Sequence, residues 1–528
     1  MSEAWQGGAG KAHGLPYKWK VLVSVVFGLF MVILDTTVVN VAFRTLQEEF
    51  AAGVNESQWI ISIYVMALGI ATPVSGYLAD RFGMKRVFVT GLALFTTGSF
   101  LCGIAPGLWW LIGARVLQGL GGGVALPLGT AFLFTAFEPR EQGRALGIFG
   151  IAIVAAPALG PIVGGWLVDA GHWRWIFFVN VPIGILGVTL GSRWLREVRA
   201  SHQSRLDVLG LVTSTIGFGA LLYAASVASQ QGWTSPRVVA FFAVGAVGLL
   251  AFALIELLVA PQPLLDLRLF NVTVFRRAAL VGWVSVIALF GAEFLLPLYL
   301  QVLRGRTALE TGVLLLPMAI ASGITTPTAG RLYDRIGARA LAVAGFSLLS
   351  LNTWQMSQLT ADTDIEWLMV LLAIRGVALG MTVQTTLVTA LSVVPVRQTA
   401  RASALINATR QVVQALAVAV LATILASAIS PALSARAQEF AGAVPAARPG
   451  EPRVELCLPE TLPAELPAPA KGAIRTFCGE YLSGLEQAYR LTFYFSLLAI
   501  ALGAMLPGWP GVWEGRHANR PVEAAVGH

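Results

Sequence analysis

Long apolar stretches alternate with short polar segments along almost the whole chain. Each stretch has roughly 20 residues, the length at which an α-helix crosses the hydrocarbon core of a bilayer. The first has the look of a signal peptide, but it is long, contains Asp35 and precedes many further stretches, so we expect an uncleaved helix. The pattern predicts fourteen spans, at about 21–43, 58–79, 87–105, 108–136, 144–168, 174–195, 207–229, 237–260, 278–303, 311–332, 340–359, 366–394, 402–427 and 489–508.

The basic residues predict the orientation of these spans. If the N-terminus is cytoplasmic, the inside segments hold most of the Lys and Arg, in groups such as those at 81–86, 193–205 and 331–339. Cytoplasmic loops carry an excess of Lys and Arg, so this orientation is favoured and both termini are expected in the cytoplasm. The short outside loops hold only Arg44, Arg174, Arg237, Arg304 and Arg306.

The composition argues against a soluble fold and against several classes of function. Of the 528 residues, 56% are hydrophobic and 12% are charged, whereas soluble domains have about 25% charged residues. The net charge of +8 sits in small groups at helix ends, with no basic face, so nucleic-acid binding is not expected. The five histidines fall in predicted loops or tails and there is no phosphate-binding G-x-x-x-x-G-K-[ST] segment, so we expect no metal site and no cofactor.

A polar motif occurs twice and indicates an internal duplication. Gly76–Arg86 and Gly330–Arg339 share the pattern G-x-L-x-D-R-x-G followed by a basic residue, 254 residues apart. Duplicated halves are typical of secondary transporters. We therefore predict a cytoplasmic tail (1–17), a six-helix bundle (18–195), a linker with two inserted spans (196–265), a second six-helix bundle (266–508) and a second cytoplasmic tail (509–528).

Four charged residues within the predicted spans matter most here: Asp35, Arg115, Glu293 and Arg375. The acids are 258 residues apart and the arginines 260 apart, so each half offers one acid and one arginine. Intramembrane charges are costly and mark functional sites by default. One interpretation is a pair of static ion pairs that hold helices together. The other is proton coupling, in which helix movement changes the distance between Asp35 and Arg115. It requires an Asp35 carboxyl open to the space between the halves rather than to lipid.

Glycine and proline mark two spans in the first half. Gly119, Gly121, Gly122 and Gly123 remove side chains from one helix, and the segment Ala156–Gly165 adds Pro157 and Pro161 to further glycines. Small residues let membrane helices approach closely and slide, and proline bends a helix. Glycine-rich or proline-containing membrane helices are common, so either feature alone is a weak signal of function. The order of the motifs along the chain is more specific.

In that order the motifs resemble the major facilitator superfamily, in its fourteen-helix branch of drug:proton antiporters. Besides the loop motif Gly76–Arg86 and the antiporter segment Ala156–Gly165, four segments carry the resemblance: Leu34–Ala42, Leu111–Gly123, Trp173–Gly184 and Asn407–Gln411. The first glycine of the antiporter segment is replaced by Ala156, which is still small. The resemblance implies an all-α membrane protein of two six-helix bundles plus two inserted helices, in a bacterial inner (plasma) membrane.

The resemblance also implies roles for individual residues. It assigns proton coupling to Asp35, Arg115 and Glu293, with the proton gradient as the energy source. Asp80 is expected at a neighbouring helix N-terminus, where the helix dipole favours a negative charge. The expected cavity residues are Asn40, Gln118, Glu293, Arg375, Asn407 and Arg410. The expected gating residues are Gly76, Asp80, Arg81, Gly83, Arg86, Gly160, Pro161, Gly164, Gly165, Asp334 and Arg335.

The segment 428–487 interrupts the pattern of spans. It is rich in Ala and Pro, takes on a helical pattern only near Leu482–Tyr489, and is expected outside the cytoplasm. Cys457 and Cys478 in this loop either form a disulfide or remain free thiols. The sequence leaves open whether this loop docks a partner such as a periplasmic adaptor protein, occludes the exit or is merely tolerated.

Export of amphipathic or cationic compounds, such as drugs, is the function that these features favour. Transport of a lipid or lipid-like metabolite by the same scaffold is the alternative, and an apolar cavity that opens sideways to the bilayer would favour it. A membrane-bound enzyme or receptor is disfavoured because the sequence shows no catalytic cluster and no folded soluble domain. Uptake by symport is disfavoured by the antiporter segment.

Overall fold

The computed structural model describes residues 15–138, 141–198, 207–260, 263–430, 457 and 468–508, and within these every regular element is helical. Most of the two tails and of the loop at 431–467 therefore lies outside the described residues, as does the side chain of Glu293. Twelve of the described helices are long and apolar enough to cross a membrane. The two remaining predicted spans correspond to helices α15 and α19.

The helices of the first half follow the predicted spans closely. Short helices α2 and α3 connect the first two spans, and a break at Val179 divides the sixth span into α8 and α9. The bounds are α1 Tyr17–Val41, α2 Phe43–Glu49, α3 Val54–Ser57, α4 Trp59–Phe82, α5 Met84–Gly103, α6 Leu108–Ala136, α7 Gln142–Asp169, α8 Trp175–Phe178 and α9 Asn180–Trp194.

The rest of the chain forms the inserted pair and the second half. The inserted pair is α10 Val208–Gln231 and α11 Pro236–Leu254, which continues as the π-helix η2 Ile255–Val259. The second half consists of η3 Leu267–Asn271, α12 Thr273–Leu298, η4 Tyr299–Leu303, α13 Ala308–Leu314, α14 Leu316–Ile336, α15 Ala338–Met356, α16 Ile365–Leu391, η5 Val396–Gln398, α17 Thr399–Ala428 and α19 Ala468–Ala504.

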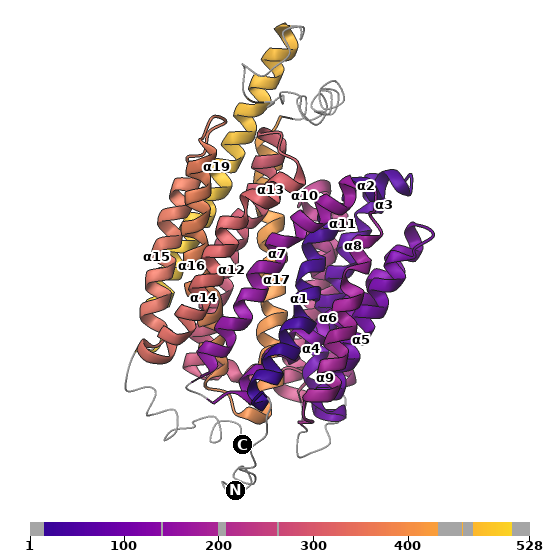
Figure 1. Ribbon diagram of the computed structural model, residues 1–528, viewed down its shortest axis with the longest axis vertical. Helices are drawn as coiled ribbons and strands as arrows, with labels where there is room; N and C mark the ends of the chain where they lie inside the picture. The colour runs from indigo at the N-terminus through magenta and orange to yellow at the C-terminus, as the bar shows by residue number, and fades with distance from the viewer. Residues whose placement is uncertain are drawn as a thin grey trace, which may run out of the picture.

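The two halves stand side by side and meet along two pairs of helices. Figure 1 shows the first-half helices α4, α5, α6 and α9 on one side and α15, α16 and α19 on the other. Helix α7 of the first half packs against α14 and α13 of the second, and α17 of the second half packs against α4 and α6 of the first. Movement of one half relative to the other would change the helix contacts at these two seams.

Glycine separates the helices at both copies of the loop motif. Gly83 ends α4 with φ +96° and Gly337 ends α14 with φ +81°, in the region that favours glycine. The next helix starts at once in each case, at Met84 and Ala338. We call the end of the molecule that carries both loop motifs the motif end. The first turn of α1 lies at this end too, since Lys18 Nζ donates to Glu141 Oε1, just before α7, at 2.8 Å.

The inserted pair covers one seam and faces outward elsewhere. Helix α10 packs against both α4 and α17. At the far end of the molecule Trp59 stacks on Tyr223 with ring centroids 5.6 Å apart, and Trp233 Nε1 donates to Thr423 Oγ1 at 2.6 Å. Helix α11 instead exposes apolar side chains such as Val247 and Leu250, as a helix facing lipid would.

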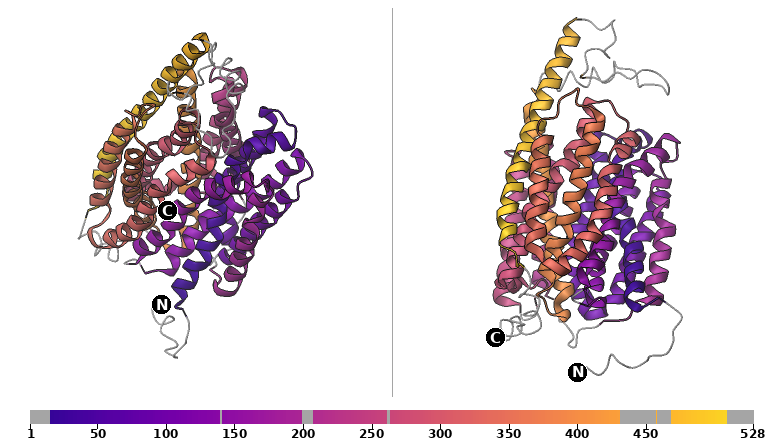
Figure 2. Two further views of the ribbon diagram at one scale, coloured as in Figure 1. Left: turned by 45° about the horizontal axis from the view of Figure 1, so that its top comes forward. Right: turned by 60° about the vertical axis from the view of Figure 1, so that its left-hand side comes forward.

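The last helix is longer than the sequence pattern predicted. It begins at Ala468 rather than near Leu482, so part of the predicted loop 428–487 is helical. Its 37 residues span about 55 Å at 1.5 Å per residue, well beyond the roughly 30 Å of a hydrocarbon core. Figures 1 and 2 show α19 rising past the ends of the neighbouring helices at the side opposite the motif end.

Candidate functional site

The Asp35 carboxyl lies at the centre of a buried polar network. The residue is fully buried about three-quarters of the way along α1. Its Oδ2 accepts from Arg115 Nη1, and its Oδ1 accepts from Gln118 Nε2 at 2.8 Å and from Asn180 Nδ2 at 3.1 Å. Three donors on one carboxyl form charge-assisted hydrogen bonds, which suit an ionised carboxylate.

Arg115 is held from several sides. Besides Asp35, it donates from Nη1 to Gln118 Oε1 at 2.7 Å and from Nε to the carbonyl of Ile60 at 3.0 Å. Its guanidinium carbon lies 4.0 Å from the centre of the Tyr64 ring, a cation–π contact. Such planar, multidirectional binding needs arginine, because a lysine ammonium is a point charge.

Two further members of the network were not assigned a role from the sequence. Ser99 Oγ accepts from Gln118 Nε2 at 3.1 Å and from Asn180 Nδ2 at 3.2 Å, and it donates to the carbonyl of Phe177 at 3.0 Å. Asn180 lies within a motif segment, but its spacing gave no hint that it would reach Asp35. Neutral polar residues in apolar stretches give a weak signal, so Ser99 and Tyr64 could not have been selected either.

The three side chains that donate to Asp35 belong to the first half of the molecule. They lie on α6 and α9, and α1 itself packs against α6, α7 and α9. The sequence hypothesis that the carboxyl is open to the space between the halves therefore does not hold in this conformation. Gln118 is also fully buried within the network, so it is not on a cavity surface here.

Arg375 occupies a similar position in the second half. It is 1% exposed, and it donates to the carbonyl of Leu289 at 2.9 Å and to Asn352 Oδ1 at 3.4 Å. Its partners on α12 and α15 enclose it, so it too is buried within its own half. The Arg115 and Arg375 guanidinium groups thus each organise the interior of one bundle. The predicted Glu293 partner has a side chain outside the described part of the chain.

The other predicted cavity residues lie apart from these networks. Asn40 is exposed near the end of α1, and Asn407 on α17 donates to the carbonyl of Ser403 at 2.8 Å. Arg410 is partly buried and lines a cavity of about 10 Å³ together with Gly282, Thr386 and Ile406. That volume holds about one water molecule. The structure does not bring these three residues to the Asp35 network.

The first loop motif joins the two halves through Asp80. Its Oδ2 accepts from Arg401 Nε, in the first turn of α17, at 2.6 Å. Arg401 Nη1 also donates to the carbonyl of Pro263 at 3.0 Å. The backbones come close here, because a Cβ added to Gly76 would lie 2.9 Å from the Arg401 Cα. The sequence gave no reason to select Arg401 as the partner.

The second loop motif joins the halves at the symmetry-related place. Asp334 accepts from the backbone N–H groups of Gly143 and Arg144, both at 3.2 Å, at the N-terminus of α7. This is the helix-terminus contact that was expected for Asp80. Gly330 packs on the same turn, since an added Cβ would lie 2.2 Å from the Gly143 carbonyl oxygen. Both copies of the motif therefore contact the other half of the molecule at the motif end.

The remaining loop-motif residues are more exposed. Arg86 Nε lies 3.9 Å from Glu197 Oε2, and the guanidinium carbon of Arg81 lies 5.7 Å from the centre of the Phe82 ring. Arg335 is exposed. A side chain at Gly83 would meet the Glu197 carboxylate, which accepts from the backbone N–H of Lys85 at 2.9 Å.

The glycine–proline segment of α7 packs against both halves. A Cβ added to Gly160 would lie 2.0 Å from Thr37 Oγ1, and one added to Gly164 would lie 3.1 Å from the carbonyl oxygen of Val38, both on α1. One added to Gly165 would lie 3.0 Å from the backbone nitrogen of Leu309. Pro161 faces Gly312, on the same helix α13 of the second half.

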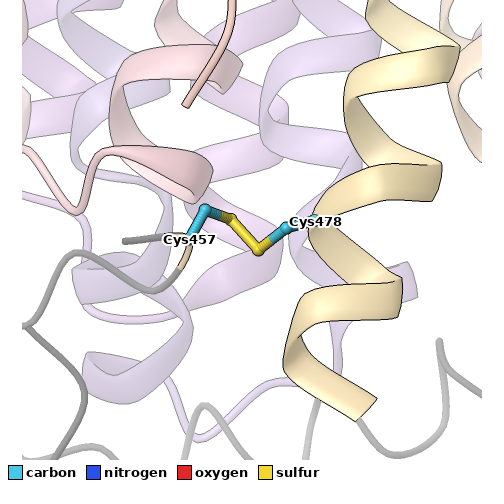
Figure 3. The surroundings of a disulfide bond; sticks show 2 residues. All are labelled: Cys457 and Cys478. Atoms are coloured by element: carbon cyan, nitrogen blue, oxygen red, sulfur yellow. A yellow bond between two sulfur atoms is a disulfide. The ribbon is translucent and has the colours of Figure 1, made fainter. Parts of the chain in front are cut away.

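Cys457 and Cys478 form a disulfide with a Cα–Cα distance of 5.6 Å, so of the two alternatives for the loop the structure has the bonded one. Figure 3 shows that the bond joins Cys457 to the outer part of α19. No group of three or more His, Cys, Asp or Glu side chains that could hold a metal ion occurs in the described ranges.

Two linked helical halves with buried charges and paired contacts at one end have the architecture of a secondary transporter. The sequence model of the Major Facilitator Superfamily matches residues 25–418, so the chain belongs to that superfamily. It is 34% identical over 396 residues to the multidrug resistance protein Stp of Mycobacterium tuberculosis, covering 74% of this chain and 73% of Stp. It is 30% identical over 398 residues to the lincomycin resistance protein LmrB of Bacillus subtilis, covering 75% and 83%.

The solved structure of the proton:xylose symporter XylE superposes with a TM-score of 0.59 at 12% identity, covering 93% of this chain and 96% of XylE, which shows the shared fold. The resemblance predicted from the motifs is therefore confirmed at the level of the family and the fold. The chain is a multi-pass membrane transporter and not an enzyme.

Proposed function

We propose that this protein is a proton-coupled antiporter that exports amphipathic or cationic compounds by alternating access. The observation that carries the proposal is the Asp35 carboxyl, which is fully buried in the membrane-spanning region and held by donors from two other helices. A carboxylate in such a place is costly unless it is paired, and it marks a proton-relay candidate.

Protonation of Asp35 would change the packing of the first half. A neutral carboxyl no longer balances the Arg115 charge, and a buried arginine without its counterion is strongly unfavourable. The helices that supply the network, α1, α6 and α9, would then shift until Arg115 found other partners. Helix α1 packs on α7, and α7 packs on α14. This shift would therefore alter the α7–α14 contact at the seam between the halves.

Because the Asp35 carboxyl is closed off from the space between the halves in this conformation, the proposal requires a second conformation in which protons reach it. In the conformation described here the carboxyl is closed off from solvent and both loop motifs hold the motif end together. We place the motif end in the cytoplasm because of its Lys and Arg content. Opening either end would let water reach the network, and the carboxyl would exchange its proton with that side.

The proton gradient supplies enough free energy for export. One proton crossing about 100 mV provides about 2.3 kcal/mol. That is roughly a 50-fold accumulation of a neutral substrate for each proton.

The relatives favour drug-like substrates. Stp and LmrB carry names that refer to multidrug and lincomycin resistance, which supports export of such compounds by this chain. A lipid-like substrate would need a sideways opening to the bilayer. One seam between the halves, α4 with α17, is covered by α10, so this route is less accessible here.

The experiment is transport by the purified protein in vesicles with an imposed pH gradient, using a panel of fluorescent cations and lipids. We expect gradient-driven uptake of cations by the wild type and none by Asp35→Asn. The matched control is Asp169→Asn, which removes an exposed carboxylate at the end of α7 and should transport normally. Wild-type rates in Asp35→Asn would refute the coupling, and lipid movement without cation movement would favour the alternative substrate.

A further inference from the structure

A second pair of carboxyl groups lies at the motif end, away from the Asp35 network. Glu256 is on η2, at the end of the inserted pair, and it is 1% exposed. Its Oε1 accepts from the backbone N–H of Leu264 at 2.9 Å. Its Oε2 is buried and has no hydrogen-bond partner among the residues that the structure describes. A buried, half-satisfied carboxyl calls for an explanation.

Asp207 lies next to Glu256. It is the N-cap of α10, where its Oδ1 accepts from the backbone N–H of Gly210 at 2.8 Å, and its Oδ2 is buried without a partner in the described part of the chain. The two carboxyl groups meet over Gly210. A Cβ added there would lie 2.2 Å from Asp207 Oδ2 and 3.0 Å from Glu256 Oε1, so a side chain at this position would have to displace the Asp207 carboxylate.

The Glu256 carboxyl is buried, and the neighbouring Asp207 carboxyl is half-buried. Like charges in a shared site oppose each other. The charged groups that act on Glu256 are Asp207 from α10 and Arg401 from α17. Asp266 lies in the same linker and also interacts with Arg401, and burial raises its pKa although Arg268 and Arg401 oppose that rise. Water is thus largely excluded from this region.

The pair is connected to the contact between the halves. Glu256 holds the turn at Leu264 through the backbone N–H. The preceding residue, Pro263, offers its carbonyl to Arg401, which in turn binds Asp80 of the first half. The inserted helices are therefore connected to the Asp80–Arg401 contact through the turn at Pro263 and Leu264.

We propose that Glu256 and Asp207 form a second proton-binding site, which stabilises the closed motif end when the pair holds one proton. Binding converts one carboxylate and one proton into a carboxyl group, and the O–H can donate to the neighbouring carboxylate. Loss of that proton leaves two negative charges in a water-poor site. Their repulsion displaces the turn at Leu264, the Pro263 carbonyl leaves Arg401, and the Asp80–Arg401 contact loses its support.

The test measures opening and closing of the motif end directly. It therefore requires neither a known substrate nor the proposed antiport. Nitroxide labels are placed on Phe82→Cys in the first half and Val396→Cys in the second, both exposed positions at the motif end. Cys102 is buried and the other two cysteines are bonded, so the labels go to the introduced sites. Pulsed dipolar spectroscopy in lipid nanodiscs then gives the ratio of closed to open distances across a pH series.

In the wild type we expect the closed-to-open ratio to fall as the pH rises, by up to about tenfold per pH unit, the limit for one linked proton. Glu256→Gln keeps an acceptor for Leu264 and removes the charge, so it should stay closed at every pH. Asp207→Asn still caps α10 and should behave in the same way. The control is Asp169→Asn, an exposed carboxyl at the end of α7 outside this chain of contacts, which should respond like the wild type.

Three outcomes would overturn the inference. One is a pH-independent ratio in the wild type, or an unchanged pH response in both Glu256→Gln and Asp207→Asn. The second is a ratio that changes with sodium at constant pH, which would make the pair a metal-cation site. The third is loss of the response in Asp35→Asn, which would assign the pH dependence to the network of the proposed antiport. A retained response in Asp35→Asn supports two separate sites.

Discussion

At the scale of single residues, the charges in the apolar stretches were predictable and their neutral partners were not. Asp35 and Arg115 stand out in the sequence because charges are rare inside spans, and the structure pairs them. Asn180 and Ser99 complete the network, yet an amide or a hydroxyl in an apolar stretch is common and carries no clear signal. The sequence therefore predicted the Asp35–Arg115 pair but not the neutral polar residues that complete its hydrogen-bond network.

Replacing Asn180 by Ala tests whether these neutral partners stabilise the Asp35 carboxylate. The change removes one of three donors to Asp35, and a hydrogen bond to a charged group contributes about 1.5–3 kcal/mol. We expect a lower midpoint of thermal unfolding in detergent and reduced proton-driven transport. Asn271→Ala, an exposed asparagine at the end of η3, is the control. Equal midpoints for the two variants would show that Asn180 does not support the network.

Arg115→Lys tests the requirement for a planar cation. Lysine keeps the charge but cannot bind Asp35, Gln118 and the Ile60 carbonyl together. We expect a folded protein with proton-driven transport lowered at least about tenfold, which corresponds to about 1.4 kcal/mol. Vesicle transport assays measure it. Unimpaired transport by this variant would mean that charge alone suffices at this position.

At the scale of helices, hydropathy predicted most elements because each span must be long and apolar. All fourteen predicted spans overlap a described helix, including α15 and α19, which fall outside the twelve that length and hydropathy select. The start of α19 was placed too late, because the Ala- and Pro-rich composition before it hides a helical pattern. The disulfide links this extension, at Cys478, to Cys457.

Gly160→Val tests the close approach of α7 to α1. Even a Cβ at this position would lie 2.0 Å from Thr37 Oγ1, so the larger side chain must push the helices apart. Overpacking typically costs 1–3 kcal/mol. We expect lower thermal stability and a proton leak in vesicles without substrate. Gly113→Ala on α6, where a Cβ would meet nothing within 4 Å, is the control and should match the wild type. If Gly160→Val is as stable as the wild type and does not leak protons, this contact does not seal the halves.

Cys457→Ser tests what the disulfide contributes. The bond closes a loop of 21 residues, and cross-links of that size stabilise by about 3 kcal/mol. We expect faster hydrogen exchange in α19 between Ala468 and Cys478 and little change in the membrane-spanning part. Transport should persist, because Asp35 and both loop motifs lie elsewhere. Unchanged exchange in the outer turns of α19 would show that packing alone orders them.

At the scale of the whole molecule, the duplication in the sequence appears as paired contacts between the halves. Asp80 binds Arg401 on α17, and Asp334 binds the N-terminus of α7, where Arg144 occupies the corresponding turn. The two motif copies were predictable from their spacing. Their partners were not, because they lie far away in the sequence and become neighbours only when the halves meet.

Exchanging the charges of Asp80 and Arg401 tests whether this contact holds the halves together. Asp80→Arg alone places two cations side by side and should favour the open motif end. Adding Arg401→Asp restores an ion pair in the reverse order and should recover part of the transport rate. A cysteine cross-link between α4 and α17 reports closure. If the double variant is no better than Asp80→Arg, the contact acts through more than its charge.

The most direct test of the account is proton release from the purified protein on addition of substrate, followed with a pH indicator in weakly buffered detergent solution. Antiport at Asp35 predicts that a transported cation releases protons from the wild type and none from Asp35→Asn, while Asp169→Asn releases as many as the wild type. Equal release from the wild type and Asp35→Asn would contradict the claim that this carboxyl exchanges protons for substrate.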